Sequence, residues 1–111
     1  MDNKQNKLLK DILNCVIRID IYTGTKKMFT EYDNNPLMQD GVERNLITIG
    51  EAMNNLLKLN PAIAISKARK IVDTRHKLTH GYDEIENLQI WSVVINHLPT
   101  LKLEVEKLLN E

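Results

Sequence analysis

The stretch PLMQDGVERNLITIGEAMNNLL, residues 36–57, decides the fold that the sequence predicts. Its apolar residues recur every three or four positions, the spacing that places side chains on one face of an α-helix. They are Met38, Val42, Leu46, Ile49, Met53, Leu56 and Leu57. Because proline suits the first helical turn and asparagine caps it, we expect this helix to begin near Pro36, with Asn34 or Asn35 as its cap. It should end at Asn60 and Pro61.

Two glycines lie inside this predicted helix, Gly41 and Gly50. Each weakens a helix by about 1 kcal/mol relative to alanine. We therefore expect each to mark close packing against a neighbouring element.

The segment before this helix repeats the same spacing between residues 6 and 23, and Gly24 is expected to end it. Its apolar stripe comprises Leu8, Ile12, Cys15, Val16, Ile19 and Tyr22. Residues 24–35 are polar and rich in turn formers, which indicates a connection with one short helical turn around Met28 and Phe29.

Two more helical segments follow. One is expected to start around Ser66 and to end or bend at Gly81, with its stripe made of Ala68, Ile71, Val72, Arg75, Leu78 and Tyr82. The next should be capped by Asn87. Its apolar positions stay in helical phase across Pro99: Trp91, Val94, Ile95, Leu98, Leu101, Val105 and Leu108. This predicts a kinked helix or two stacked segments rather than a reversal of the chain.

These segments predict an all-α fold, an antiparallel bundle of four to five helices whose last helix is kinked at Pro99. No alternating pattern predicts a strand. At 111 residues the chain has the size of one domain, so residues 1–111 are expected to form a single helical domain.

The composition is that of a globular protein, with 42% hydrophobic and 27% charged residues. The apolar runs are far shorter than the roughly 20 residues needed to cross a bilayer, so we expect a cytoplasmic protein without membrane contact. The lone Cys15 is expected to be a small buried apolar residue. Fifteen basic residues balance fifteen acidic ones, so any RNA binding must depend on a local patch.

The stretch DTRHKLTHGYDEI, residues 73–85, concentrates polar and titratable side chains. Arg75 is its odd member, because it shares the helical phase of Ile71 and Leu78 and should face the interior. A guanidinium cannot lose its charge there, so it must meet a carboxylate, an opening or a second subunit. An arginine at the edge of the stripe, paired with Glu51, explains the sequence equally well.

Two histidines four residues apart, His76 and His80, lie on one helix face and raise the possibility of a metal site. Asp73, Asp83 or Glu84 could add a third ligand. The motif nevertheless lacks the glutamate of HExxH, because Lys77 occupies that place. We therefore predict no metal and no cofactor, and keep a metal-binding bundle as a third hypothesis.

Arg75 and His80 also suit metal-free RNA cleavage. That chemistry needs a proton donor or acceptor near neutral pH and a cation that stabilises the developing phosphorane charge. The spacing is awkward, because five residues turn a regular helix by about 140°. Either the helix distorts at Gly81, the long arginine reaches round, or two subunits share the site.

The string RHKLTHGY, residues 75–82, resembles the R-x4-H motif of HEPN ribonucleases, and in particular the R-x4-H-x-Y motif of HepT-like toxins. The block RNLITIGEA, residues 44–52, is similar to the second helix of that family. The tail that begins at Trp91 and contains Leu98 and Pro99 is similar to its last helix.

This resemblance implies an endoribonuclease toxin with an all-α HEPN fold, the toxin of a type VII-like toxin–antitoxin pair. It implies a homodimer, or a higher oligomer, with both R-x4-H motifs at an interface cleft. RNA would be the substrate, with Arg75 and His80 catalytic and His76 in support. Arg44 and Glu51, seven residues apart, could position Arg75 or phosphate, although a structural salt bridge explains them equally well.

The resemblance further implies an antitoxin of the MntA type, a nucleotidyltransferase that transfers AMP from ATP to Tyr82. A bulky anionic group beside His80 would close the cleft to phosphate. Gly81 departs from the family pattern, which usually has a larger residue there, and this puts activity in question. The alternative hypothesis is a non-catalytic helical module that binds a nucleotidyltransferase partner or a nucleotide.

Overall fold

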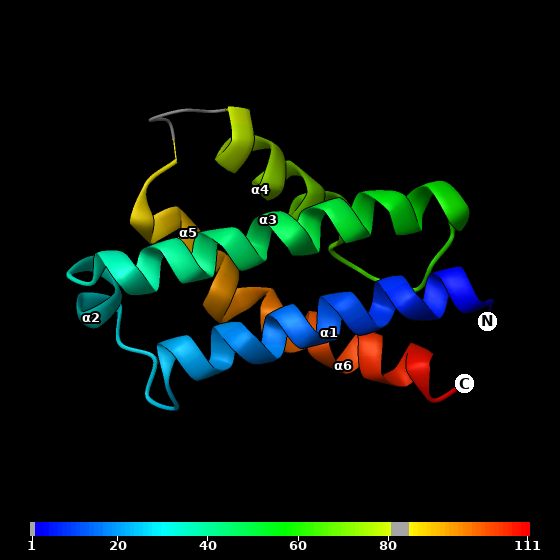
Figure 1. Cartoon of the computed structure of the whole chain (residues 1–111), viewed down its shortest axis with the longest axis horizontal. Helices are drawn as coiled ribbons and strands as arrows, with labels where there is room; N and C mark the ends of the chain where they lie inside the picture. The colour runs from blue at the N-terminus through cyan, green and yellow to red at the C-terminus, as the bar shows by residue number, and fades with distance from the viewer. Residues whose placement is uncertain (1, 81–84) are drawn as a thin grey trace.

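The computed structural model describes residues 2–80 and 85–111, and within these ranges the chain is all helix and connection, with no strand. The helices are α1 (Asn3–Thr23), α2 (Phe29–Asp33), α3 (Pro36–Leu59), α4 (Ala68–His80), α5 (Asn87–Asn96) and α6 (Leu98–Leu109) (Figure 1). The predicted all-α class is confirmed. No helix of the described residues is long and apolar enough to cross a membrane.

Helix α3 is the central element of an elongated molecule that measures 41 × 30 × 19 Å. It runs antiparallel to α1 on one side and packs against α4 on the other (Figure 1). Helix α6 lies along α1, and α5 connects it to the end of the molecule that holds α2. The predicted stretch 36–57 therefore forms the helix on which the two long neighbours pack.

Among the described residues, the predicted apolar side chains form the core or pack against it, with the exceptions of Tyr22 and Ile95. Every predicted apolar position of α3 between Val42 and Leu56 is buried. Tyr22 and Ile95 were expected to be buried, but they are 43% and 38% exposed. Tyr22 lies over Gly41 at the edge of the α1–α3 contact, and Thr23 takes the interior position beside it.

The helix ends follow local hydrogen bonding. Asn35 caps α3, because its Oδ1 accepts a hydrogen bond from the Met38 N–H at 3.1 Å. Gly24 ends α1 with a φ of 77°, a conformation that favours glycine. The predicted cap Asn87 is wrong by one residue: the cap is Glu86, whose backbone N–H donates to Gln89 Oε1 at 2.9 Å.

The expected start of the third long helix at Ser66 is also early, because α4 begins at Ala68. The N–H and hydroxyl of Ser66 bond the Glu104 carboxylate on α6, at 2.9 and 3.2 Å. This tie to a distant helix holds Ser66 in the connection before α4.

The joint near Pro99 interrupts the predicted last helix without reversing it. Helix α5 ends at Asn96 and α6 begins at Leu98, so that Pro99 falls in the first turn of a new helix. Proline is tolerated there because the first-turn N–H groups have no partner within the helix. The single residue between the two helices is His97, and its N–H still donates to Val93 O at 2.9 Å.

Both glycines of α3 mark close contacts, as predicted. A β-carbon at Gly50 would overlap the Cβ of Arg75 and would lie 2.7 Å from its Cγ. A β-carbon at Gly41 would lie 3.0 Å from Cδ2 of the half-exposed Tyr22 ring. The Cβ of Arg75 is bonded to the backbone of α4 and cannot move without the helix, whereas the ring of Tyr22 can rotate away.

We predict opposite outcomes for alanine at these two positions. Gly50→Ala should lower the free energy of unfolding by about 1–3 kcal/mol, because α4 must move away from α3. Gly41→Ala should leave it unchanged or raise it by up to about 1 kcal/mol, because alanine favours helix. Urea unfolding followed by circular dichroism measures both. Equal stability of the two variants would contradict the close α3–α4 crossing.

Candidate functional site

The residues that the sequence singles out lie on α4, where this helix crosses α3. Ile71 and Thr74 are buried, and they fix the side of α4 that faces the bundle. Arg75 follows directly and lies over Gly50, so its β- and γ-carbons fill the space that a side chain at position 50 would occupy. The stem of Arg75 is therefore held between two helices.

The guanidinium of Arg75 reaches from this crossing toward solvent. Its Nη2 lies 3.8 Å from Glu51 Oε1, and the two side chains are 28% and 54% exposed. Its Nε is buried and has no hydrogen-bond partner among the described residues. An ion pair this long and this exposed contributes at most about 1 kcal/mol, so the guanidinium keeps donors for another anion.

The two histidines of α4 form a pair on its exposed side. The ring centroids of His76 and His80 lie 4.9 Å apart, and the rings are tilted by 56°. Thr79 tightens this last turn, because its hydroxyl donates to Arg75 O at 3.0 Å and to His76 O at 3.2 Å. The structure thus brings His76 and His80 together and presents both to solvent.

Arg75 and His80 point to different sides of α4. The helix is regular from Ala68 to His80, so five residues separate the two side chains by about 140° around the axis. None of the hydrogen bonds or ion pairs of the described residues joins them. Within one chain, Arg75 belongs to the α3 side and His80 to the outer side.

Arg44 and Glu51 line one open groove along α3, with a volume of about 640 Å³. Asp40 and Glu43 also line it, and burial together with the charge of Asp40 raises the pKa of Glu43. Arg44 is exposed, and the ion pair of Glu51 is with Arg75. Glu51 therefore forms its salt bridge with Arg75, which joins α3 to α4. Arg44 remains a basic side chain at the groove.

Tyr82 and Gly81 lie outside the described residues, and so do Asp83 and Glu84. Among residues 2–80 and 85–111, no three His, Cys, Asp or Glu side chains come close enough to hold a metal ion. The His76–His80 pair therefore has no third ligand within these ranges.

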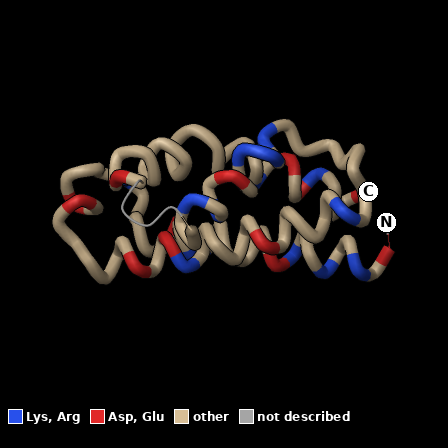
Figure 2. The backbone as a smooth tube through the Cα atoms, turned by 90° about the horizontal axis from the view of Figure 1, so that it is seen from above, with Lys and Arg blue, Asp and Glu red and all other residues tan. Residues whose placement is uncertain are grey.

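Charge is distributed unevenly over a chain whose formal net charge is zero. Helix α4 carries four basic side chains, Arg69, Lys70, Arg75 and Lys77, against the single carboxylate of Asp73. Figure 2 shows that many basic positions lie in the half of the molecule that holds the two termini, with carboxylates interspersed among them, and that the opposite end carries mainly carboxylates. The helix with the candidate site is thus locally basic.

The sequence reasoning missed a small basic pocket between α4 and α5. Its lining includes Lys70, Lys77 and His97. Lys70 and Lys77 are seven residues apart and share a face of α4, which the sequence could have shown. The sequence does not predict that His97 lines this pocket, because the position of His97 depends on the break between α5 and α6.

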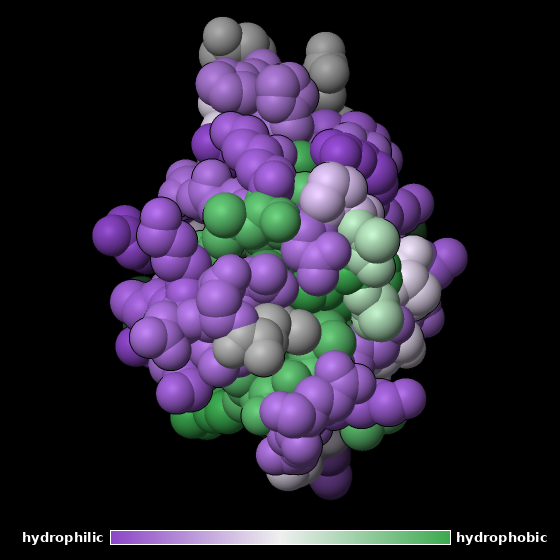
Figure 3. All heavy atoms as spheres, turned by 90° about the vertical axis from the view of Figure 1, so that its right-hand side faces the viewer, coloured by the Kyte–Doolittle hydropathy of each residue, from purple (hydrophilic) through white to green (hydrophobic). Residues whose placement is uncertain are grey.

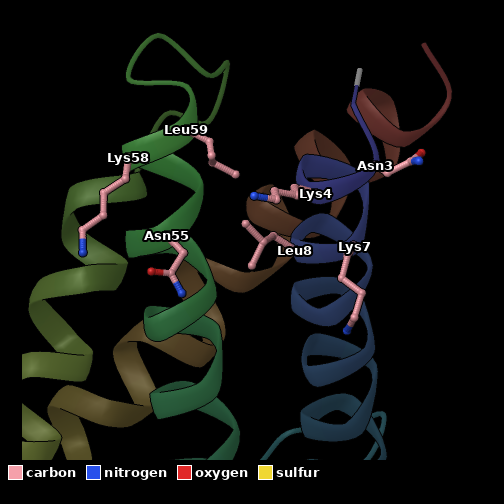
Figure 4. Close-up of a pocket in the computed structure, with 7 residues that line it drawn as sticks. All are labelled: Asn3, Lys4, Lys7, Leu8, Asn55, Lys58 and Leu59. Carbon is pink, nitrogen blue, oxygen red and sulfur yellow. The ribbon is translucent and has the colours of Figure 1, made fainter.

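A second hollow lies between α1 and α3, at the end of the molecule that holds both termini. It has a volume of about 600 Å³, and Leu8 and Leu59 approach each other across it while Lys58 points away (Figure 4). Viewed from that end, hydrophobic surface lies between hydrophilic side chains (Figure 3). The described residues of its lining offer lysines and amides but no acid, imidazole or nucleophile for RNA cleavage.

Comparison with known proteins gives a consistent result. Residues 12–108 match the model of the family described as ribonuclease HepT-like. Two proteins of Methanocaldococcus jannaschii, each named as a candidate RNase, are 30% identical over 94 residues. Those matches cover 83% of this chain and 78% and 81% of the relatives. A third from the same organism, named likewise, is 34% identical over 98 residues, covering 83% of this chain and 78% of the relative. No solved structure gives a significant match.

Proposed function

The chain belongs to the ribonuclease HepT-like family, and from this membership and the geometry of α4 we propose that it is a metal-independent endoribonuclease. It acts in the cytoplasm as the toxin of a type VII-like toxin–antitoxin pair. The observation that carries this proposal is Arg75, whose stem is held over Gly50 while its guanidinium reaches solvent on the α3 side of the helix that presents two exposed imidazoles on its outer side.

The proposed reaction needs only groups of this chain, RNA and solvent water. The 2′-oxygen attacks the adjacent phosphorus, its bond to phosphorus forms, and the bond from phosphorus to the 5′-oxygen breaks. Either His80 takes the proton of the 2′-hydroxyl and water protonates the leaving 5′-oxygen, or His80 protonates the 5′-oxygen and water takes the proton of the 2′-hydroxyl. Arg75 binds the phosphate and stabilises the extra negative charge of the transition state. His76, one turn from His80, supports its orientation.

The position of Arg75 favours a functional role over a structural one. A leucine at this phase of α4 would pack on α3 without an ion to desolvate, whereas the buried Nε lacks a partner among the described residues. Leaving a buried donor unsatisfied costs about 1–3 kcal/mol. Such local conflicts between a residue and its environment are expected at functional sites.

The separation of Arg75 and His80 supports a site shared by two chains. In a two-fold dimer each cleft can combine Arg75 of one protomer with His80 of its partner. An apolar surface that a partner can cover lies at the α2 end of the molecule, where Ile21 and Leu37 are 71% and 82% exposed. A groove of about 450 Å³ lined by Tyr22, Leu37 and Arg44 continues this surface toward the Glu51 side of α3.

The regulatory partner in this proposal is an MntA-type nucleotidyltransferase that transfers AMP to Tyr82. Tyr82 follows α4 by two residues, so an adenylate there adds negative charge close to His80. The competing hypothesis is a non-catalytic module that binds this partner or a nucleotide. The separation of Arg75 and His80 within one chain favours that alternative if no dimer forms.

We predict that the protein cleaves RNA in the presence of EDTA and that Arg75→Ala and His80→Ala each lower the rate by about 10²–10⁴-fold, the contribution of a positioned acid, base or charge. His76→Ala should have a smaller effect. Arg69→Ala is the matched control, because Arg69 is an exposed arginine of the same helix. Cleavage of a labelled RNA measures the rates. Wild-type rates in either of the first two variants would refute the mechanism, and no cleavage by the wild type would favour the non-catalytic module.

We also predict that the two inactive variants restore activity when they are combined. If each site uses Arg75 from one chain and His80 from the other, a mixed dimer of Arg75→Ala and His80→Ala chains retains one intact site. Randomly paired chains should then recover about one quarter of the wild-type rate. Co-expression with two affinity tags isolates the mixed dimer, for which the RNA assay should give about one half of the wild-type rate. If the mixture stays as inactive as its components, both groups act from the same chain.

For Tyr82 we predict the mass of AMP on this tyrosine after co-expression with the partner nucleotidyltransferase and ATP. Peptide mass spectrometry locates the group. Tyr22 is the internal control, because it is a tyrosine that is partly exposed, and Tyr82→Phe should abolish the addition. AMP on Tyr22, or none on either residue, would refute the regulatory proposal.

A further inference from the structure

A small pocket lies between α4 and α5, on a side of α4 different from the one that holds Arg75. Its volume is about 190 Å³. Two buried residues, Thr74 and Val93, are part of its lining. Its polar lining comprises Lys70, Lys77, Gln89, Ser92 and His97.

The charged groups of this pocket are all basic. Lys70 and Lys77 lie seven residues apart, so their side chains leave the same face of α4, with Thr74 between them. The described residues that line the pocket include no carboxylate. No ion pair or hydrogen bond of the described residues engages either lysine ammonium, so both keep their donors for a ligand.

His97 completes the pocket from the junction of α5 and α6. Its Nδ1 is buried and has no hydrogen-bond partner among the described residues. Burial, and then the charges of Lys70 and Lys67, lower the pKa of this imidazole. The ring is therefore held close to a concentration of positive charge that an anion would neutralise.

We propose that the α4–α5 pocket binds a phosphate group through Lys70, Lys77 and His97. The inference rests on the proposed ribonuclease function in one respect: the phosphate is taken to be one of the RNA backbone, bound on a side of α4 different from the one that holds Arg75. The pocket itself follows only from the geometry of α4, α5 and His97. It would hold RNA in register without touching the reacting bonds.

Size and chemistry select a phosphate over larger ligands. Pockets for drug-sized molecules usually exceed about 300 Å³, so this one has no room for a whole nucleotide. Lysine ammonium groups bind phosphate as point charges, and the imidazole becomes a second kind of donor when it is protonated. The amide nitrogen of Gln89 is a further neutral donor, because its Oε1 accepts from the Glu86 N–H.

The test follows the imidazole of His97 by NMR as sulfate is added. Sulfate has the shape of phosphate and keeps its charge across the pH range in which histidine titrates. We expect sulfate to shift the His97 resonance saturably and to raise the pKa of His97, because the anion stabilises the imidazolium against Lys67, Lys70 and Lys77. Lys70→Gln and Lys77→Gln should each weaken sulfate binding by about tenfold, the loss of one charge-assisted hydrogen bond.

Lys10→Gln is the matched control, because it removes one charge from an exposed lysine of α1, outside this pocket. It should leave sulfate binding unchanged. The proposal is overturned if His97 does not respond to sulfate, or if Lys10→Gln weakens binding as much as the pocket variants do. Lys70 and Lys77 are exposed, so their substitutions should leave the fold intact.

Two further titrations identify the source of the phosphate. Inorganic phosphate alone and a 2′-O-methyl RNA, which lacks the attacking hydroxyl, are each added to the wild type and to Lys70→Gln. A His97 shift with the RNA that is lost in Lys70→Gln assigns the site to the nucleic-acid backbone, and a shift with inorganic phosphate but none with the RNA assigns it to a small phosphate compound. Neither result depends on cleavage, so loss of activity in the Arg75 and His80 variants would not affect this test.

Discussion

The close crossing of α3 and α4 at Gly50 and Arg75 is the constraint on which the functional surface depends. Because Gly50 has no β-carbon, the two helices approach until the stem of Arg75 occupies that space. This contact fixes the rotation of α4 about its axis. Once that rotation is set, every other residue of the helix has a defined direction.

Three sides of α4 then differ in character. Ile71 and Arg75 face α3, while Lys70 and Lys77 face the pocket against α5. His76 and His80 face outward. A regular helix directs Arg75 and His80 to different sides, which favours the proposal that the site is shared with a second chain. The same geometry allows a phosphate on the α5 side without interference with the reacting groups.

The sequence predicted the helices well, because their apolar spacing is regular and their ends carry asparagine, proline and glycine. It predicted the tight packing at Gly50, but not that Arg75 would be the neighbour. It misplaced helix starts where tertiary bonds compete with local ones, as when Glu104 holds Ser66 in a connection. The pocket at His97 could not be predicted from the sequence. It forms where the junction of α5 and α6 packs near α4, and a local sequence pattern does not show which helices pack together.

The charge of the chain bears on how the proposed nuclease would meet RNA. A protein with zero formal net charge has no long-range field to attract a polyanion, whereas α4 has four basic side chains against one carboxylate. In physiological salt such a local excess of positive charge acts over roughly 8 Å. It therefore strengthens the binding of RNA that is already in contact with α4, and it does not attract RNA from a distance. In a two-fold dimer the α4 helices of both protomers would contribute, doubling this excess around the shared clefts. Binding would then depend on several short-range phosphate contacts made together, and an adenylate beside His80 would oppose them with negative charge placed inside that same short range.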